Sequence, residues 1–508
     1  MATVVGSSAA LLKLEKLRSA GPLEKYSNIR HHLGYYYNVA VSAVYKIPHS
    51  LSRPLREYVY QATEQLIGKH PILSAVPVGE DTNDPYFVRL PAVDLEQSIF
   101  FHDWSDASPG STDKCDQEGN VGSGDSNLDL FLETEHNTPF VNWLPFWRLH
   151  IISTSTTEQD FISVFVYHHS IGDGSSGTAF HSTFLGAFTD ALAVNSGEPK
   201  TIIQSPSLPL LPSLESIHPF PVSIFYILKA IFYTKIWNRP DPELWAGGKI
   251  SLPLKNKVHH ITLSKSDSAA LRKSCRDQGT TITGAIQTLL ARALFICLPI
   301  EFTKLSCTSA ISIRRWLSSD IITSDSIGVW VMDYADLYKR NHVAQPPSFP
   351  WDEARRSRKT IEETLRRRGR DTKVGLLRFV RDVPGELLTC MIGRERSVSF
   401  EISNLGVFKP SVKYLQASQT TDTVPEINEN DRSNVPQIGK VVFSQSASVT
   451  GSAVNLSVVT GSDERMVLTF SWQDGIVDPQ LVASVAMEMK REIDLLISQQ
   501  EKDNPTAA

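Results

Sequence analysis

Two adjacent histidines open the run His168-His169-Ser170-Ile171-Gly172-Asp173-Gly174, which is the strongest candidate for chemistry in the chain. An imidazole has an ordinary pKa of about 6.5, so its large neutral fraction at pH 7 can accept a proton and return it. An alcohol is a weak nucleophile until it loses its proton. We therefore expect His169 to act as the general base for attack of a hydroxyl on an acyl thioester. The imidazolium then protonates the departing thiolate, and no covalent acyl-enzyme is needed.

The flanking residues predict how this run is held. Residues 161–167 have the continuous apolar composition of a strand buried on both faces. Gly172 and Gly174 allow a tight turn, and a helix with phenylalanines every four residues from 180 to 188 follows. Such a strand-turn-helix junction can fix a side chain at the mouth of a cleft. The alternative is that both histidines only hydrogen-bond at a buried strand end, but Asp173 between two glycines favours catalysis.

Further polar residues are candidates for contacts with the reacting groups. Hydrogen-bond donors aimed at a developing oxyanion are often the largest single contribution to acyl transfer. Four candidate donors follow strand-like runs, with turn formation as the alternative for each: Ser403, Asn404, Ser444 and Gln445. The side chains at 31–32 and 35–37, two histidines and three tyrosines, are candidates for the acceptor side, with core packing as the alternative.

Length and composition limit the class of protein. A chain of 508 residues is too long for one ordinary core and predicts two domains. With 41% hydrophobic and 21% charged residues the chain is globular, and a net charge of −5 argues against a nucleic-acid partner. Five scattered cysteines without a CxxC pair indicate neither a disulfide framework nor a zinc site. No secretion signal is recognisable, so we expect a cytoplasmic protein.

The stretch 219–237 is rich in bulky apolar residues but is interrupted by Pro221, Lys229 and Lys235. A membrane-spanning helix needs about 20 predominantly apolar residues, so we expect a buried helix or a channel wall here, and no spanning segment. The opening at 11–17 is amphipathic, which favours docking on the protein itself. Peripheral attachment to the endoplasmic reticulum or to lipid droplets stays open as the alternative.

Both halves of the chain supply strands and helices, which predicts an α/β fold rather than one all-β and one all-α domain. We expect helices at 55–66, 266–277, 283–297 and 479–498, and strands at 260–263, 399–402, 453–459 and 466–472. A stretch rich in proline and glycine suggests domains at 1–220 and 255–500 joined by a connection at 221–254. Polar segments at 103–127 and 416–434 are expected to be exposed loops.

The run at 168–174 matches the HHxxxDG signature of the chloramphenicol acetyltransferase-like superfamily, which includes acyl-CoA-dependent acyltransferases and peptide-synthetase condensation domains. The opening from 23 to 39, Leu-Glu-Lys-Tyr-Ser through Arg-His-His-Leu-Gly-Tyr-Tyr-Tyr-Asn-Val, resembles the fungal alcohol acetyltransferase family in particular. Segments 69–73, 310–315 and 402–406 agree with that family in the same order. The resemblance therefore covers nearly the whole chain.

This resemblance implies two similar α/β sandwich domains with a tunnel between them, His169 midway, and donor and acceptor entering from opposite faces. It implies a structural role for Asp173, which pairs with an arginine in such proteins; Arg314 is the candidate partner and Arg315 the next. It also implies an acyl-CoA co-substrate, a small-molecule alcohol as acceptor, and neither a bound cofactor nor a metal ion.

The chain lacks the DFGWG motif of the plant branch and an attached carrier or adenylation domain, which favours a discrete enzyme with a diffusible donor. The leading hypothesis is transfer of acetyl from acetyl-CoA to the hydroxyl of a small molecule or secondary metabolite. Two alternatives stay open. One is a longer acyl group or one bound to a carrier protein, as in polyketide biosynthesis, and the other is a non-catalytic ligand-binding relative.

Overall fold

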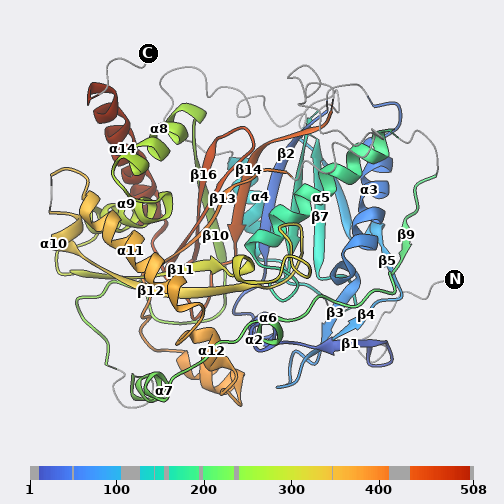
Figure 1. Cartoon of the computed structure of the whole chain (residues 1–508), viewed down its shortest axis with the longest axis horizontal. Helices are drawn as coiled ribbons and strands as arrows, with labels where there is room; N and C mark the ends of the chain where they lie inside the picture. Colours follow the sequence, from blue (N-terminus) through green and yellow to red (C-terminus); the bar gives the residue numbers. More distant parts are fainter. Residues whose placement is uncertain are drawn as a thin grey trace.

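The structure, a computed structural model, describes residues 11–47, 51–104, 126–141, 143–153, 160–193, 198–233, 239–345, 347–410 and 435–503. Two large sheets lie side by side, each with helices packed against it (Figure 1). The larger core cluster surrounds the N-terminal sheet, and a second cluster surrounds the C-terminal one. The predicted α/β fold is confirmed.

The N-terminal sheet has the order β14-β2-β8-β7-β6. Its strands are β2 (Val39–Lys46), β6 (Ile99–Asp103), β7 (Trp147–Ser153), β8 (Asp160–Tyr167) and β14 (Gln437–Gln445). The central strand β8 is antiparallel to both neighbours, and its last residue, Tyr167, lies opposite Val39 and Trp147. Seven of its eight residues are buried, as expected for a continuous apolar strand covered on both faces.

Helix α5 (Gly174–Ala193) lies along this sheet, next to α3 (Leu55–Lys69) (Figure 1). A Cβ atom added to Gly177 would lie 2.2 Å from Cγ2 of Val41, so the helix can approach the strands this closely only through a glycine. One turn later the rings of Phe180 and Phe165 stack with centroids 3.7 Å apart. The start of α5 is therefore fixed against β2 and β8.

The C-terminal sheet has the order β10-β16-β15-β13-β11-β12. Its strands are β10 (Asn256–Leu263), β11 (Lys304–Ser312), β12 (Val331–Lys339), β13 (Phe400–Val407), β15 (Val454–Thr460) and β16 (Met466–Gln473). The helices on this half are α8 (Lys265–Asp277), α9 (Ile282–Cys297), α10 (Arg340–Val343), α11 (Trp351–Arg367), α12 (Lys373–Leu377) and α14 (Pro479–Asp503).

Smaller elements complete the described fold. A three-stranded sheet has the order β1-β4-β3, and β5 pairs with β9. These elements are β1 (Lys16–Ser19), α2 (Pro22–His32), β3 (Ala75–Val78), β4 (Tyr86–Arg89), β5 (Ala92–Asp94), α4 (Ser126–His136), β9 (Ile202–Gln204), α6 (Leu214–Ile217) and α7 (Ile224–Ile231). Short helical turns lie at Pro71–Ser74, Leu95–Gln97, Arg314–Trp316, Pro384–Leu388 and Thr389–Met391.

Strand β14 crosses between the two halves. It lies late in the chain, at 437–445, but it pairs with β2 at the edge of the N-terminal sheet. The division into 1–220, 221–254 and 255–500 stays a prediction, and strand pairing assigns β14 to the sheet of the first half. The polar segment 416–434 lies outside the described residues, as does most of 103–127.

The predicted helices and strands are confirmed as α3, α8, α9 and α14 and as β8, β10, β13, β15 and β16, with ends shifted by a few residues. The prediction of a buried helix within 219–237 is wrong: α7 has no buried residue, because only its inner side meets the protein. Within the described ranges no single helix is long and apolar enough to cross a membrane, although α8 and α9 pass by length and composition as a pair bent by 102°.

Candidate active site

The 168–173 segment joins β8 to α5 at the boundary between the two sheets. A Cβ atom on Gly172 would lie 2.8 Å from Cβ of Ser176, and one on Gly174 would lie 2.8 Å from Cδ2 of Leu405 on β13. Glycine at these positions therefore lets the turn close tightly and lets α5 begin directly against the C-terminal half. The motif is a rigid junction, as its composition predicted.

His169 is the partly open member of the histidine pair. Its ring centroid lies 5.6 Å from that of Tyr36, and the guanidinium of Arg30 lies over the Tyr36 ring, 4.6 Å from its centroid. Burial, and then the positive charge of Arg30, lower the pKa of His169 to about 4. The backbone carbonyls of His169 and Gly172 oppose this shift. At neutral pH the imidazole is therefore uncharged and can accept a proton.

The two ring nitrogens of His169 differ. Nδ1 is buried and has no hydrogen-bond partner among the described residues, although the backbone carbonyls of His169 and Gly172 favour a proton on the ring. No hydrogen bond within the described residues engages Nε2, and this nitrogen is not among the buried unpaired atoms. A proton on Nδ1 leaves the lone pair on Nε2, so Nε2 is the atom able to take a proton from a substrate.

His168 has a different environment, with 1% of its surface exposed. Its Nδ1 accepts the backbone N–H of Ser170 at 2.9 Å and lies 2.7 Å from the hydroxyl of the same residue. Its ring packs 4.9 Å from that of Phe146. Burial, and then the neighbouring His31 and His169, lower its pKa well below the ordinary value. This residue is enclosed and supports the strand end.

His168 also belongs to a buried cluster with His31 and Glu80, whose potential ligand atoms all lie within 4.8 Å of one another. Oε1 of Glu80 lies 3.5 Å from Nδ1 of His31 and 4.0 Å from Nε2 of His168. The remote nitrogen of each histidine accepts a backbone N–H, from Phe140 for His31 and from Ser170 for His168. A ring nitrogen that accepts a hydrogen bond carries no proton, so in each ring a proton lies on the nitrogen that faces Glu80.

This proton assignment decides what the cluster can bind. A metal-bound neutral imidazole carries its proton on the remote nitrogen and donates it to an acceptor. In His31 and His168 the remote nitrogens instead face backbone donors. The two N–H groups therefore face Glu80 without forming a hydrogen bond to it, and this arrangement of protons disfavours a metal ion. Glu80 is a residue that the sequence analysis missed, because no local pattern distinguishes it.

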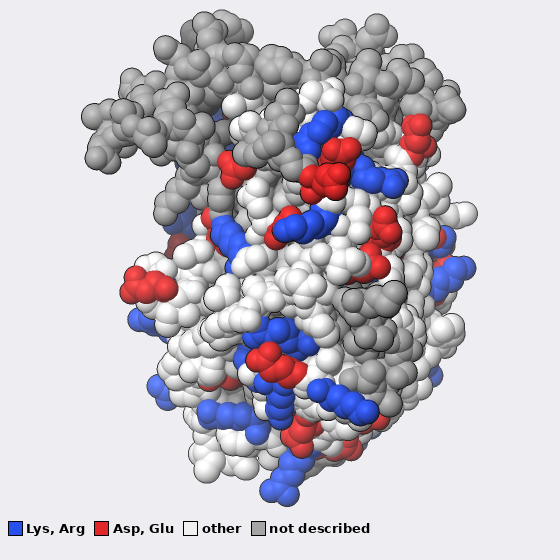
Figure 2. Space-filling view, turned by 90° about the vertical axis from the view of Figure 1, so that its right-hand side faces the viewer, with Lys and Arg blue, Asp and Glu red and all other residues white. Residues whose placement is uncertain are grey.

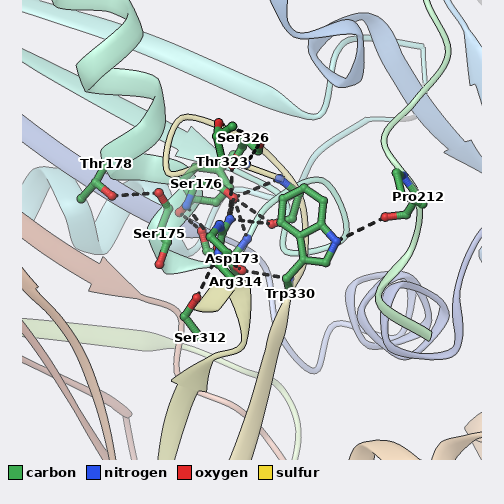
Figure 3. Close-up of polar contacts among 12 residues, drawn as sticks. Asp173, Ser175, Ser176, Thr178, Pro212, Ser312, Arg314, Thr323, Ser326 and Trp330 are labelled. Atoms are coloured by element: carbon green, nitrogen blue, oxygen red, sulfur yellow. Dashed lines mark hydrogen bonds and ion pairs between the residues drawn. The ribbon is translucent and has the colours of Figure 1, made fainter. Parts of the chain in front are cut away.

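The structure brings Asp173 and Arg314 together, with Nη1 of the arginine 2.7 Å from Oδ2 of the carboxylate (Figure 3). The backbone N–H of Trp330 donates to the same oxygen at 2.9 Å, and the backbone N–H of Ser176 donates to Oδ1 at 3.1 Å. Burial opposes the charge on Asp173, but the charge and hydrogen bonds of Arg314 outweigh it and lower the pKa of the carboxyl. Arg315, the second candidate partner, is exposed.

Arg314 is itself held by several groups of the 326–330 segment. Its Nη2 lies 3.3 Å from the carbonyl oxygen of Ser326, and its guanidinium stacks 4.9 Å from the Trp330 ring centroid. The backbone N–H of Asp173 donates to the carbonyl of Gly328 at 3.1 Å. Asp173 points away from solvent into this network, so the pair ties the catalytic turn to the C-terminal half.

The four candidate oxyanion donors have different environments. The hydroxyl of Ser444 lies 2.8 Å from Nε2 of the buried His136, and the side-chain amide of Asn404 donates to Thr283 at 3.1 Å. These two polar groups are therefore engaged in the scaffold. The amide of Gln445 lies 3.5 Å from the hydroxyl of Ser403 and so links β14 to β13. Gln445 pairs with Val39, which pairs with Tyr167, so it lies at the same sheet end as the motif.

A cavity of about 300 Å³ lies behind the turn. Ser170, Ile171, Gly328 and Trp330 contribute to its lining, but His169 does not. It adjoins Ser170 and Ile171 on the supporting side of the motif. Arg30, which shapes the charge around His169, lies in the opening segment on which the family resemblance rests, but its charge effect could not be read from the sequence.

The comparisons with known proteins agree with this geometry. The alcohol acetyltransferase family model matches residues 132–489. The chain is 34% identical over 482 residues to crmB of Aspergillus fumigatus, a probable alcohol acetyltransferase, covering 91% of this chain and 96% of that one. It is 23% identical to FCK4 of Fusarium pseudograminearum, also named a probable alcohol acetyltransferase, over 93% and 94% of the two chains.

Solved structures show the same fold at low sequence identity. The trichothecene 15-O-acetyltransferase TRI3 of Fusarium sporotrichioides superposes with a TM-score of 0.69 at 16% identity, covering 97% of both chains. The epimerization domain of tyrocidine synthetase B gives 0.58 at 14% identity, over 96% of this chain and 97% of that domain. The chain belongs to the alcohol acetyltransferase family and is an O-acyltransferase with the chloramphenicol acetyltransferase-like fold.

Proposed function

We propose that the chain transfers an acyl group, most simply acetyl from acetyl-CoA, to the hydroxyl of a small-molecule alcohol with His169 as general base. The observation that supports this most directly is the contrast within the histidine pair. His168 is enclosed, whereas His169 is neutral, partly open and leaves Nε2 unengaged among the described residues. A base must be neutral and reachable, and only His169 of this pair meets both requirements.

In the proposed reaction Nε2 of His169 takes the hydroxyl proton as the oxygen attacks the thioester carbonyl. The new C–O bond forms, and the carbonyl oxygen becomes an oxyanion that needs donors. The intermediate then collapses, the C–S bond breaks, and the imidazolium gives its proton to the departing CoA thiolate. The products are an ester and free CoA, and the base is regenerated neutral. Ser403 and Gln445 remain the candidate donors.

Asp173 contributes without touching the substrate. Because its carboxylate is directed into the contacts with Arg314 and Trp330, its role in this proposal is to hold the turn that carries His169. Because the pKa of His169 is lowered to about 4, its imidazole stays neutral, and able to act as a base, over a wide pH range. Acyl-CoA is consumed as a co-substrate, and the chain's own residues supply the base and the donors.

The test is mass spectrometry of a mixed panel of alcohols incubated with purified protein and acetyl-, butyryl- or octanoyl-CoA. The proposal predicts alcohols heavier by one acyl group, free CoA in equal amount, and at least about 10²-fold slower product formation with the His169→Ala variant. Equal product from the wild type and that variant would reject His169 as the base. Product formed from the longer donors but not from acetyl-CoA would reject the acetyl assignment.

A further inference from the structure

Helix α7 presents its apolar side to the outside of the molecule. Ile224 is 76% exposed, Phe225 79%, Leu228 59% and Ile231 50%. At 100° per residue these four side chains occupy one continuous arc of the helix. A surface helix of a globular protein normally turns this arc inward and its charged arc outward. In α7 the apolar arc faces outward instead, and this exposure does not stabilise the isolated chain.

The helix is anchored, so the exposure is not that of a loose segment. Ser223 caps its first turn by accepting the N–H of Tyr226, and the backbone N–H of Ser223 donates to Asp371 at 2.6 Å. Phe220, just before the helix, is buried in a small core cluster. Tyr226 and Ile227 are half-buried on the inner side. The fold thus holds the apolar arc outward.

The segment that anchors α7 is strongly basic. Residues 366–381 contain six arginines and Lys373 against one acidic residue, Asp371, within a chain whose overall net charge is −5. The six arginines are all exposed: Arg366, Arg367, Arg368, Arg370, Arg378 and Arg381. Asp371 accepts the N–H of Ser223 and pairs with Arg370 at 3.8 Å, and Lys373 pairs with Asp333, so the excess positive charge belongs to the other arginines.

The apolar helix and the basic segment lie together. Figure 1 shows α7 beside α12, at the end of the molecule away from the chain's C-terminus. The direct contacts between 218–223 and 368–375 agree, because Asp371 donates its N–H to the carbonyl of Pro221 and Val222 packs against Gly375. On the face in Figure 2, by contrast, basic and acidic side chains are intermixed.

We propose that α7 and the arginines of 366–381 form a docking surface for a bilayer that contains anionic lipids. The apolar arc would enter the boundary between headgroups and acyl chains, and the arginines would contact lipid phosphates and carboxylates. A second copy of the chain is the less favourable occupant, because two such surfaces would bring like charges together. A bilayer supplies both required chemistries, apolar depth and negative surface charge, over an area wide enough for both.

Vesicle sedimentation with the full chain tests this surface. We expect binding to vesicles of 70% phosphatidylcholine and 30% phosphatidylserine to exceed binding to pure phosphatidylcholine by at least about tenfold at ~0.1 M salt. Raising the salt should weaken it severalfold, since the Debye length falls from about 10 Å to about 3 Å at 1 M. Equal binding to both vesicles, or no binding to either, would overturn the proposal.

Variants locate the surface. The I224S/F225S/L228S protein and the R366Q/R367Q/R378Q protein should each lose at least about tenfold in binding to the anionic vesicles. The matched control I300S/M487S changes residues that are 75% and 60% exposed elsewhere, and it should bind as the wild type does. All variants should keep their melting temperature and their acyl transfer to a water-soluble alcohol. If the α7 variant bound vesicles as well as the wild type does, the bilayer would be rejected as occupant. It would also be rejected if the variant kept its vesicle binding but lost a concentration-dependent dimer that the wild type forms.

Discussion

The buried pair of Asp173 and Arg314 allows a quantitative prediction. In Asp173→Asn the side chain keeps its shape but has one acceptor oxygen in place of two. The contacts that the carboxylate accepts come from Arg314 and the N–H of Trp330 at Oδ2, and from the N–H and the hydroxyl of Ser176 at Oδ1. Whichever way the amide turns, its NH₂ group faces a donor. The variant therefore loses a charge and also forces donors against one another.

The expected cost follows from burial. Asp173 is 2% exposed, and the side chain of Arg314 is 12% exposed, so solvent cannot replace the lost contact. Removing one partner of a buried pair typically costs about 3–5 kcal/mol, because the remaining charge stays uncompensated. At about 1.4 kcal/mol per tenfold change, this corresponds to a loss of roughly 10²- to 10³-fold or more in the folding equilibrium. Activity should fall with stability, because the same turn holds His169.

The assay is urea denaturation of the wild type, Asp173→Asn, Arg314→Ala and the double variant, followed by fluorescence. Arg315→Ala is the matched control, since it removes an adjacent but exposed arginine and should shift the unfolding free energy by less than about 0.5 kcal/mol. The double variant should be less destabilised than the sum of the single ones. A change below about 1 kcal/mol in Asp173→Asn, or strict additivity, would refute the argument.

The pair also sets the direction of the acid dependence. The folded pKa of Asp173 is below its unfolded value of about 3.9. The stability that the ionised carboxylate contributes is therefore fully present above about pH 4 and is lost as the pH falls through the folded pKa. In Asp173→Asn this contribution to the fall of the unfolding free energy at acid pH should disappear, while the contributions of other groups remain.

The remaining predictions concern the base, the packing of α5 and the buried cluster. His169→Ala should lower turnover by about 10²–10⁴-fold with little change in melting, whereas the exposed His32→Ala should not lower it. With a pKa of about 4, about 97% of His169 is neutral at pH 5.5, against about 9% for an ordinary histidine, so kcat/KM should be nearly the same at pH 5.5 and 7.5; a decline centred on pH 6.5 would contradict this. Gly177→Ala should destabilise by about 1–3 kcal/mol, since its Cβ would overlap Val41, whereas Gly68→Ala, with open space in a helix, should stabilise by about 0.5–1 kcal/mol in the same denaturation assay. Exhaustive chelation should leave turnover unchanged, because the tautomers of His31 and His168 disfavour a metal ion; activity restored by one particular metal would show the reverse.

The sequence predicted the elements whose periodicity is strong and local. Strand β8 is a continuous apolar run, and α9 has apolar residues at helical spacing, so both could be identified without the fold. The pairing of β14 with β2 could not, since it joins residues about 400 apart and depends on tertiary packing. The α7 prediction failed for a related reason: apolar composition predicted the helix, but not that its apolar side would face outward.

The site divides in the same way. The motif residues 168–174 are contiguous, so their junction could be predicted, and the family resemblance supplied Arg314 as the candidate partner of Asp173. Glu80 lies in a turn after β3 with no local pattern, and only the fold brings it to His31 and His168. Asn404 and Ser444 looked like free donors because a sequence does not show the partners, Thr283 and His136, that occupy their polar groups.

The different roles of the two histidines follow from their positions at one strand end. Tyr167 ends β8, and the chain passes through His168 into a turn that begins at His169, so the two side chains meet different surroundings. His168 therefore enters the core of the first half, where Phe146 and Glu80 enclose it, while His169 turns toward the Arg30 and Tyr36 side. If the register of the junction slipped by one residue, the enclosed and open positions would exchange. The tight turn at Gly172 and the contacts of Asp173 with the C-terminal half oppose that slip. The contacts of Asp173 therefore also keep His169, and not His168, in the open position.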